Sequence, residues 1–406
     1  MRILLLNGYN ANMHVDGAKL FVRDGVTDLN TKPEEYIFSP KKIDVDHIVV
    51  YGRNGNISID AIRWLIKHNV QISILNWDGK LLTTMLPPES VQVKTKFHQY
   101  DAYKDSIKRN HIARKLLEAK FSRTQLVLDW LKERYPALKN DFSSEAPLFR
   151  KAKTIPEMMM VEGRIASIYW QEFAKIVPKK FEFDARKYQK RPWGAGDTVN
   201  CLLNYAYALL EAECLKAINS SGLDVHIGFL HEMCNGKNSL AYDLQEPFRF
   251  LIDLAVINLI ENNVMEKKDF IRTDNYNLRL KASGAKKVTE EVNKLFNRKT
   301  EYLGYQYSMN YIILLKSREL AQYLSGKNNE INFSIPEIKI NRQDAEDVRQ
   351  KIRDIKYSDW KKLGFSKGTL HYMKQNADGD KPFTMNKHVR DRLAEWDEMA
   401  AEIKID

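Results

Sequence analysis

The sequence predicts an α+β fold in three parts: a small amino-terminal β domain over residues 1–95, a large all-helical domain over 96–325, and a carboxy-terminal helix-turn-helix over 342–406. Three observations support this division. Short β-prone runs separated by turn residues fill the first part. Long stretches with helical periodicity fill the second. The segment 326–341 has weak periodicity and a Gly-Lys-Asn-Asn run, and it is predicted to be a linker.

The first part alternates strands with turns. We expect strands over residues 2–6, 19–22, 36–38, 47–51, 70–75 and 81–86. Ser58 is a plausible N-cap for one short helix that ends near His68. Asp78-Gly79 between the last two runs predicts a hairpin turn. We expect this domain to serve as a scaffold or dimerisation unit.

The second part carries amphipathic stretches that predict long helices. They cover residues 103–134, 157–176, 197–219, 243–262, 287–297 and 303–324. Pro178, Pro192, Gly222 and Gly236 mark breaks between them. These stretches are long enough to form a domain with its own core.

Composition excludes several protein classes. The 406 residues contain only three cysteines and no C-x-x-C pair, which argues against a disulfide framework or a zinc knuckle. The amino terminus is apolar for too few residues to form a signal peptide. The most apolar run, 251–260, is far too short to span a membrane. We therefore expect a cytoplasmic protein that does not bind membranes.

Positive charge is in excess and is clustered. The chain has 64 Lys and Arg against 53 Asp and Glu, a net charge of +11. Residues 94–123 hold nine basic and three acidic residues, and residues 173–191 hold seven and two. Clusters of this kind with interspersed aromatic residues favour contact with a nucleic-acid backbone, although solvated helix faces would look similar. The candidate DNA-binding residues here are Lys108, Arg109, Lys179 and Lys180.

Three short motifs in the helical part bring together residues that suit a metal site. Glu162 lies on an otherwise apolar helical face, where an unpaired charge would be costly. His231 follows an apolar run, and Asp243 and Glu246 are three residues apart near Pro247. Each residue alone has an ordinary structural explanation, a buried salt bridge or a core histidine. Together, carboxylates from two helices and one histidine favour Mg²⁺ or Mn²⁺.

The order of these motifs resembles that of the CRISPR-associated spacer-acquisition integrases. The resemblance spans about residues 1–325 and rests on the runs 47–52, 55–58, 162–163, 228–231 and 243–249. It implies a β domain joined to a helical catalytic domain, and a site for Mg²⁺ or Mn²⁺ held by Glu162, His231 and Glu246. It also implies that Asp243 is a catalytic acid beside the metal, with Asp253 a weaker candidate.

The last segment extends beyond most members of that family. Gly364 permits a sharp turn and Ser366 can cap a second helix, which predicts a helix-turn-helix. Its candidate DNA-reading residues are Lys367, Thr369, His371 and Lys374, and a third helix is expected near 385–399. A helical hairpin used for oligomerisation remains an alternative. A core of this family with such a tail resembles the casposases, the transposon-encoded relatives of the CRISPR integrases.

The resemblance implies an endonuclease and integrase that joins 3′-hydroxyl DNA ends to target DNA by direct transesterification. The implied partners are double-stranded DNA, as element ends and target, and further copies of the chain in a dimer or larger oligomer. One alternative is a CRISPR spacer-acquisition integrase, which would also need a small CRISPR partner protein. A less favoured one is a non-enzymatic helix-turn-helix DNA-binding protein.

Overall fold

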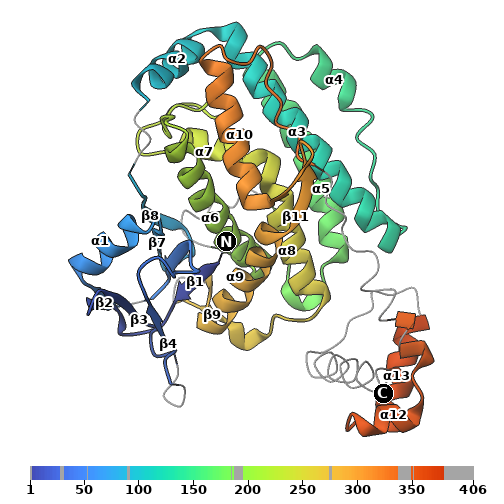
Figure 1. Ribbon diagram of the computed structural model, residues 1–406. Helices are drawn as coiled ribbons and strands as arrows, with labels where there is room; N and C mark the ends of the chain where they lie inside the picture. The colour runs from blue at the N-terminus through green and yellow to red at the C-terminus, as the bar shows by residue number, and fades with distance from the viewer. Residues whose placement is uncertain are drawn as a thin grey trace.

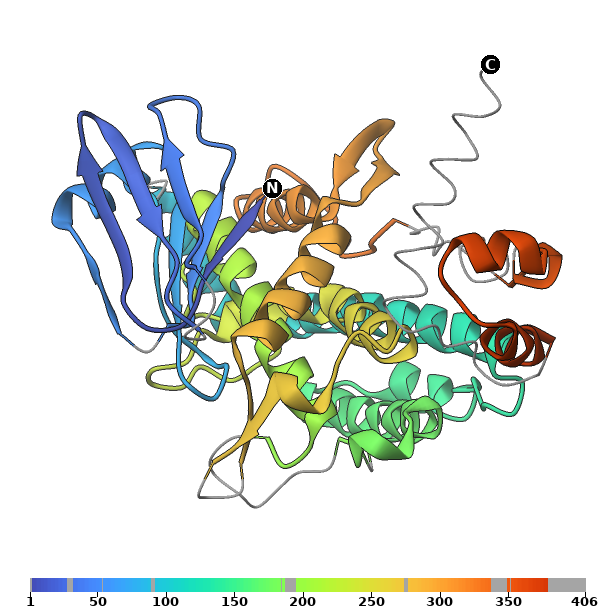
Figure 2. The same cartoon turned by 90° about the horizontal axis from the view of Figure 1, so that it is seen from below.

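The computed structural model describes residues 2–27, 32–52, 54–88, 92–183, 185–186, 195–273, 277–336, 349–350 and 352–378. Its mixed α+β architecture agrees with the prediction at that level. A strand-rich amino-terminal region lies to one side of a larger helical region (Figure 1). In the view from below, the two regions remain distinct (Figure 2).

The amino-terminal region contains two four-stranded sheets. One has the order β1-β5-β7-β8, with β1, β5 and β7 parallel and β8 antiparallel to β7. The other has the order β4-β3-β2-β6. The strands are β1 (Ile3–Leu6), β2 (Ala11–Asp16), β3 (Lys19–Arg23), β4 (Glu35–Phe38), β5 (His47–Val50), β6 (Gly55–Ile57), β7 (Gln71–Leu75) and β8 (Leu81–Met85). Strands β2 and β6 were not predicted.

Local signals in this region correspond to observed structure. Helix α1 (Ile59–Lys67) begins after Ser58, whose hydroxyl accepts a hydrogen bond from the Ala61 amide at 3.1 Å. Gly79 has φ of +82° in the turn between β7 and β8. This positive φ explains why glycine suits the position.

A buried polar cluster joins the β region to the helical region. The ring of His47 on β5 lies 2.8 Å from the Ser73 hydroxyl and 3.2 Å from a Glu213 carboxylate oxygen. The Gln71 amide donates to the Ala212 carbonyl at 3.1 Å. Glu213 and Ala212 belong to α6 (Thr198–Ser220), which therefore contacts the β region through a buried hydrogen bond to Gln71 and a close polar contact with His47.

The helical region is built around α6, most of whose residues are buried. Its other helices are α2 (Val93–Lys104), α3 (Ser106–Arg134), α4 (Ala146–Lys151), α5 (Ile155–Ile176), η1 (Lys179–Phe181), α7 (Ser239–Gln245), η2 (Glu246–Phe248), α8 (Arg249–Glu261), η3 (Lys267–Asp269), α9 (Ala282–Asn297) and α10 (Met309–Leu324). Helices α3, α5 and α8 pack together with η2, and this places the site described below.

The region predicted to be all-helical also contains strands, so that part of the prediction is wrong. Two antiparallel pairs form here: β9 (Phe270–Arg272) with β10 (Leu278–Leu280), and β11 (Lys299–Tyr302) with β12 (Tyr305–Ser308). Leu303 and Gly304 both have positive φ in the second turn. That geometry is typical of a tight hairpin, and it starts the last long helix at Met309 instead of residue 303.

The first half of the predicted linker packs against the helical core. Ile331, Phe333 and Ile335 are buried there, and the Lys316 ammonium donates to the Asn332 carbonyl at 2.8 Å. Sequence periodicity did not reveal this because the segment 328–336 has no helix or strand. The sequence 337–348 lies outside the described residues.

The helices α12 (Tyr357–Lys362) and α13 (Lys367–Asp378) lie further along the chain. Gly364 between them has φ of +84°, and the Ser366 hydroxyl accepts from the Thr369 amide at 3.1 Å. Trp360, fully buried, is surrounded by a separate apolar cluster that includes Leu370 and Met373. The third helix predicted near 385–399 lies outside the described residues.

Among the helices of the described residues, none is both long and apolar enough to cross a membrane.

Candidate metal centre

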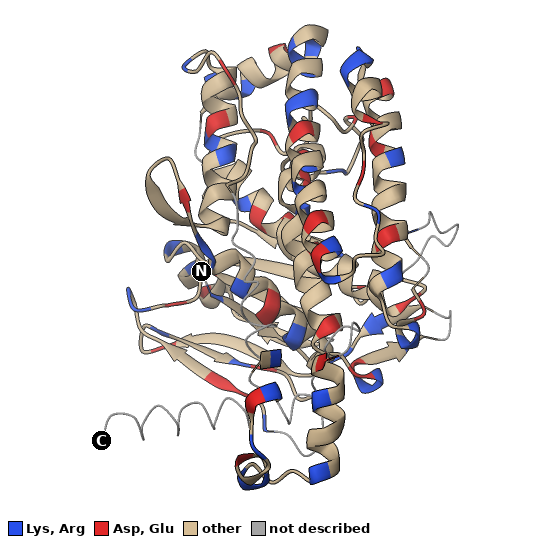
Figure 3. Ribbon diagram, turned by 90° about the vertical axis from the view of Figure 1, so that its right-hand side faces the viewer, with Lys and Arg blue, Asp and Glu red and all other residues tan. Residues whose placement is uncertain are grey.

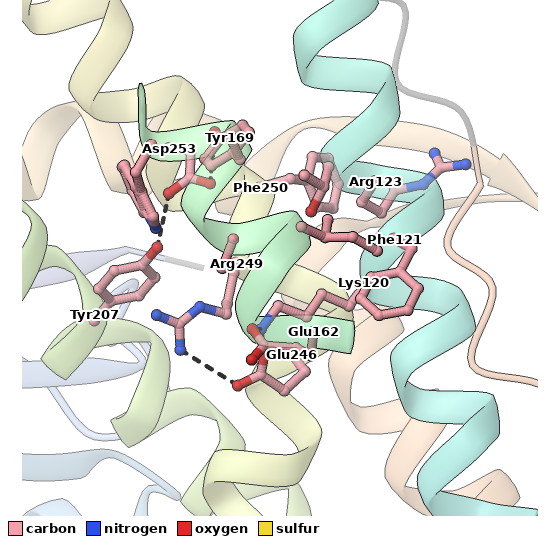
Figure 4. A pocket seen from close by; sticks show the side chains of 14 residues that line it. Lys120, Phe121, Arg123, Glu162, Tyr169, Tyr207, Glu246, Arg249, Phe250 and Asp253 are labelled. Atoms are coloured by element: carbon pink, nitrogen blue, oxygen red, sulfur yellow. Dashed lines mark hydrogen bonds and ion pairs between the residues drawn. The ribbon is translucent and has the colours of Figure 1, made fainter. Parts of the chain in front are cut away.

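Two of the predicted metal ligands meet between three helices. Glu162 projects from α5 and Glu246 is the first residue of η2, where Pro247 interrupts the regular helix between α7 and α8. Both carboxylates line a pocket closed on one side by α3, from which Lys120 extends towards them (Figure 4). Helix α5 is fixed at its start by a capping box between Thr154 and Glu157.

The ammonium group of Lys120 lies between the two carboxylates. Its Nζ is 2.5 Å from Glu162 Oε1 and 2.7 Å from Glu246 Oε2. The second contact is an ion pair without hydrogen-bond geometry, so the buried Glu246 Oε2 has no hydrogen-bond partner. Burial alone would raise the pKa of Glu246, but Lys120 and Arg249 outweigh it and lower that pKa to about 2.

His231 is oriented by Asp243. Asp243 is fully buried, and its Oδ1 is 2.8 Å from the His231 Nδ1. With Nδ1 engaged, Nε2 is the ring nitrogen available to a metal, as in other carboxylate–histidine–metal arrangements. Burial would lower the pKa of His231, but its hydrogen bond to Asp243 and the charges of Asp243 and Glu246 raise it. His231 is not among the residues that line the pocket of Glu162 and Glu246.

Asp243 also holds the backbone of the loop that carries His231. Its carboxylate accepts from the amides of Phe229, Leu230 (3.0 Å) and His231 (2.9 Å). Gly228 allows this loop to approach α7, because a Cβ there would lie 2.8 Å from the Ser239 backbone. The structure thus assigns Asp243 a positioning role, which spacing alone did not distinguish from that of a ligand.

Helix α3 holds the same loop from the other side through Arg109. Its Nε donates to the Phe229 carbonyl at 3.0 Å, and its Nη2 is 3.1 Å from the Glu232 carboxylate. The guanidinium also lies over the Tyr103 ring, 4.3 Å from the centroid. Arg109 was predicted as a DNA-binding residue, and in the structure its side chain contacts the loop that carries His231.

Substituting Arg109 by methionine is expected to lower the rate of the chemical step about tenfold while changing DNA affinity no more than a few-fold, because a support of the His231 loop is removed. The neighbouring exposed Lys108 is the matched control. Lys108→Met should weaken DNA binding slightly and leave the single-turnover rate unchanged. Equal effects of the two substitutions on rate and affinity would mean that Arg109 acts only as a surface cation.

A second buried network lies behind Glu246. Tyr169 and Tyr207 donate to the two oxygens of Asp253 at 2.8 Å and 2.7 Å (Figure 4). Arg249 lies over the Tyr207 ring and reaches a Glu246 oxygen at 3.4 Å. Burial raises the pKa of Asp253 despite its two phenol donors and the nearby arginines. Arg249 links this network to Glu246, and no sequence motif gave either tyrosine a role at the site.

The other predicted DNA-binding residues lie on α3, η1 and α13. Lys108, Lys179 and Lys180 are exposed, and the Lys180 ammonium donates to Asn263 at 2.6 Å. On α13, Lys367 and His371 are exposed. The Thr369 hydroxyl is 2.9 Å from that of Ser366, and the Lys374 ammonium donates to the Arg353 carbonyl at 2.7 Å. Basic and acidic residues alternate along the long helices seen in Figure 3.

Similarity to known proteins identifies the family. The sequence model of the family described as "CRISPR associated protein Cas1" matches residues 4–294. The chain belongs to the Cas1 family. A Cas1 endonuclease from Archaeoglobus fulgidus is 28% identical over 81% of this chain and 98% of its own length. A Cas1 protein from Thermotoga maritima has the same fold, with 21% identity, a TM-score of 0.67, and 83% of this chain and 100% of its own covered.

Within the Cas1 family, the chain is similar to a casposase. The solved structure described as "Casposase bound to integration product" is 55% identical, with a TM-score of 0.83, and the match covers 88% of this chain and 100% of that one. This identity places the chain among the casposases, and the predicted resemblance is confirmed.

Proposed function

We propose that this Cas1-family chain is a divalent-metal-dependent DNA integrase that joins 3′-hydroxyl DNA ends to target DNA by direct transesterification. The observation that carries the proposal is the meeting of Glu162 and Glu246, from separate elements, in one pocket, together with a His231 ring that is fixed by Asp243. The similarity to a casposase bound to an integration product supports the same reaction.

The donor set fits Mg²⁺ or Mn²⁺. Two carboxylates and one imidazole form a mixed oxygen and nitrogen set that suits these hard or borderline cations. The orphaned Glu246 Oε2 supplies a buried acceptor at the proposed site. Within the described residues, no group of three or more His, Cys, Asp or Glu side chains is already arranged as a metal site. The Lys120 ammonium lies between the two carboxylates instead.

A bound divalent cation would supply Lewis-acid stabilisation of the charge that develops on the phosphodiester. Glu162, Glu246 and His231 Nε2 would hold that cation, while Asp243 keeps His231 in the required tautomer. The exposed lysines of α3 and η1 would bind the DNA backbone. A 3′-hydroxyl attacks the target phosphodiester and a 3′-hydroxyl leaves, so the number of phosphodiester bonds is unchanged and no covalent protein intermediate forms.

A strand-joining assay tests the proposal. Purified protein should join a labelled oligonucleotide with a 3′-hydroxyl to a supercoiled plasmid in Mn²⁺ or Mg²⁺, and EDTA should stop the reaction. An oligonucleotide with a 3′-deoxy end is the matched control and should not be joined. Equal joining of both ends, or joining in EDTA, would contradict direct metal-dependent transesterification.

The alternative function is CRISPR spacer acquisition. It is considered because several relatives are named as CRISPR-associated endonucleases. That function requires a small partner protein to set the distance between two active sites. We favour the casposase reaction because of the 55% identity, and we propose a homo-oligomer on double-stranded DNA. Joining by the purified chain alone would distinguish the two, since the alternative predicts that the partner protein is needed.

Binding to duplex DNA is expected to weaken steeply as salt rises, because each neutralised phosphate releases counterions with a log–log slope of about −0.9. Reversing charge at Lys179 and Lys180 together, or at Lys108, should make the slope less negative by roughly one unit for each phosphate that is no longer neutralised. Fluorescence anisotropy across a salt series measures this. Lys67→Glu on α1, outside the basic clusters, is the control. An unchanged slope in both variants would assign these lysines to ordinary solvated helix faces.

We further propose that α12 and α13 read DNA sequence through the exposed face of α13. A chain ending after Pro336 should keep metal-dependent joining, since every proposed ligand lies upstream, but lose preference among DNA sequences. One good bidentate base contact contributes roughly 1–3 kcal/mol of discrimination. Selection from a random duplex library measures that preference, with Lys367→Ala as the point variant. If the truncated chain kept its DNA sequence preference but no longer formed an oligomer, α12 and α13 would serve in assembly instead of DNA reading.

A further inference from the structure

We propose that Lys120 is an exchangeable counter-cation: its ammonium neutralises Glu162 and Glu246 while no metal is bound, and a divalent cation displaces it from between them. This inference rests on the proposed function, because it concerns the same pair of carboxylates. According to this proposal, Lys120 must leave the two carboxylates and so open the metal site before the DNA reaction can begin.

The ammonium occupies the place between the two carboxylates that a metal would need. Its contacts of 2.5 Å to Glu162 and 2.7 Å to Glu246 join carboxylates from two separate elements. The three side chains are 17%, 16% and 5% exposed, respectively for Lys120, Glu162 and Glu246. Two carboxylates so close and so poorly hydrated need a cation. Lys120 provides it from a third element, and Figure 4 shows the three side chains converging.

The charges in the pocket are already balanced without a metal. The two carboxylates carry two negative charges, and Lys120 together with Arg249, 3.4 Å from Glu246, offsets them. A divalent cation added with Lys120 in place would leave excess positive charge in a poorly hydrated pocket. The repulsion between an ammonium and a divalent ion at such range is large. One of the two basic side chains must therefore leave when the metal binds.

The chemistry of the two basic side chains indicates which one leaves. Lys120 lines the pocket and has a flexible four-carbon stem that ends in a single ammonium group. Arg249 is held more firmly, since its guanidinium stacks over Tyr207, 4.3 Å from the ring centroid, as well as pairing with Glu246. Displacement of Lys120 requires only rotation about its stem.

Amine labelling of the wild-type protein tests the exchange. The full chain, free of DNA, is treated briefly with an acetylating N-hydroxysuccinimide ester with and without saturating Mn²⁺, and Lys120 acetylation is read by mass spectrometry. An ammonium enclosed between two carboxylates, on a side chain only 17% exposed, is poorly accessible to the reagent and reacts slowly. Mn²⁺ should therefore increase acetylation of Lys120 several-fold. Lys115 on the same helix, paired with Glu118 at 2.8 Å, is the internal reference and should not change.

Calorimetric titration with Mn²⁺ supplies the second measurement. Lys120→Met should bind Mn²⁺ at least about tenfold more tightly than the wild type, because a competing unit charge at close range is gone. Lys115→Met is the matched control and should bind as the wild type does. His231→Ala should lose binding, which shows that the titrated site is the proposed one.

The possible outcomes distinguish a failure of the Lys120 exchange from a failure of the proposed metal site. If Mn²⁺ binds the wild type and His231→Ala abolishes that binding, the metal site stands. In that case, unchanged or reduced labelling of Lys120 in Mn²⁺, or weaker Mn²⁺ binding by Lys120→Met, overturns the exchange alone. If the wild type binds no Mn²⁺, the proposed metal site fails and the exchange fails with it.

Discussion

Replacing His231 by alanine, or Glu162 or Glu246 by glutamine, is expected to abolish DNA strand joining while leaving DNA affinity within a few-fold of the wild type. The loss should exceed the roughly 10–100-fold effect typical of residues that only support a metal ligand. Each substitution removes a proposed donor to the metal, whereas the exposed lysines that bind the DNA backbone are untouched.

Glu118→Gln is the matched control for these carboxamide variants. Glu118 lies on α3 near the site but is exposed and paired only with Lys115 at 2.8 Å, so its loss should change neither rate nor affinity. Rates are measured in single turnover with saturating DNA, and binding is measured at one fixed salt concentration. Normal joining by His231→Ala would exclude His231 as a ligand.

Asp243→Ala is expected to have the largest effect on stability. The substitution removes a fully buried carboxylate that accepts three backbone amides and His231 Nδ1. Removing one partner from such a buried charged network costs about 3–5 kcal/mol, and in a domain of this size it should lower Tm by roughly 6–20 °C. Strand joining should fall by at least ~10–100-fold even below the new Tm, because His231 loses its orientation.

Differential scanning calorimetry measures the change in Tm, with Asp60→Asn on α1 as the control. Asp60 is an exposed acid paired with Arg63 at 3.2 Å, so Tm should stay within about 1 °C. If Asp243→Ala lowered Tm but kept full activity at low temperature, Asp243 would support the loop without orienting the histidine. If Tm did not change, the hydrogen-bonding role given to Asp243 would be wrong.

The sequence indicated three candidate ligands but not the groups that surround two of them in the structure. Glu162, His231 and Glu246 could be found because each lies in a short motif that resembles a known family. Lys120 could not, because one lysine among the nine basic residues of 94–123 carries no sign that its side chain points inward. The role of Asp243 also required the structure, since only the fold shows that its oxygens face the amides of the 229–231 loop.

In the fold, features determined by neighbouring residues were predicted, whereas features determined by distant residues were missed. Ser58 and the Asp78-Gly79 turn act through neighbouring residues, so their effect was readable in the sequence. Strand β6 is three residues long and pairs with β2, more than forty positions away, so no local pattern revealed it. The hairpin at Leu303-Gly304 was missed because β12 directly precedes the apolar period of α10 and was interpreted as the start of that helix.

Anomalous diffraction from crystals of the full chain soaked in Mn²⁺ can decide whether Glu162, Glu246 and His231 together hold a divalent cation. We expect an anomalous peak bounded by the two carboxylates and His231 Nε2. Asp243 should still be bonded to Nδ1, and the Lys120 ammonium should have moved from between the carboxylates. A fully occupied Mn²⁺ elsewhere in the chain, with Lys120 still bridging Glu162 and Glu246, would show that these residues do not form the metal site.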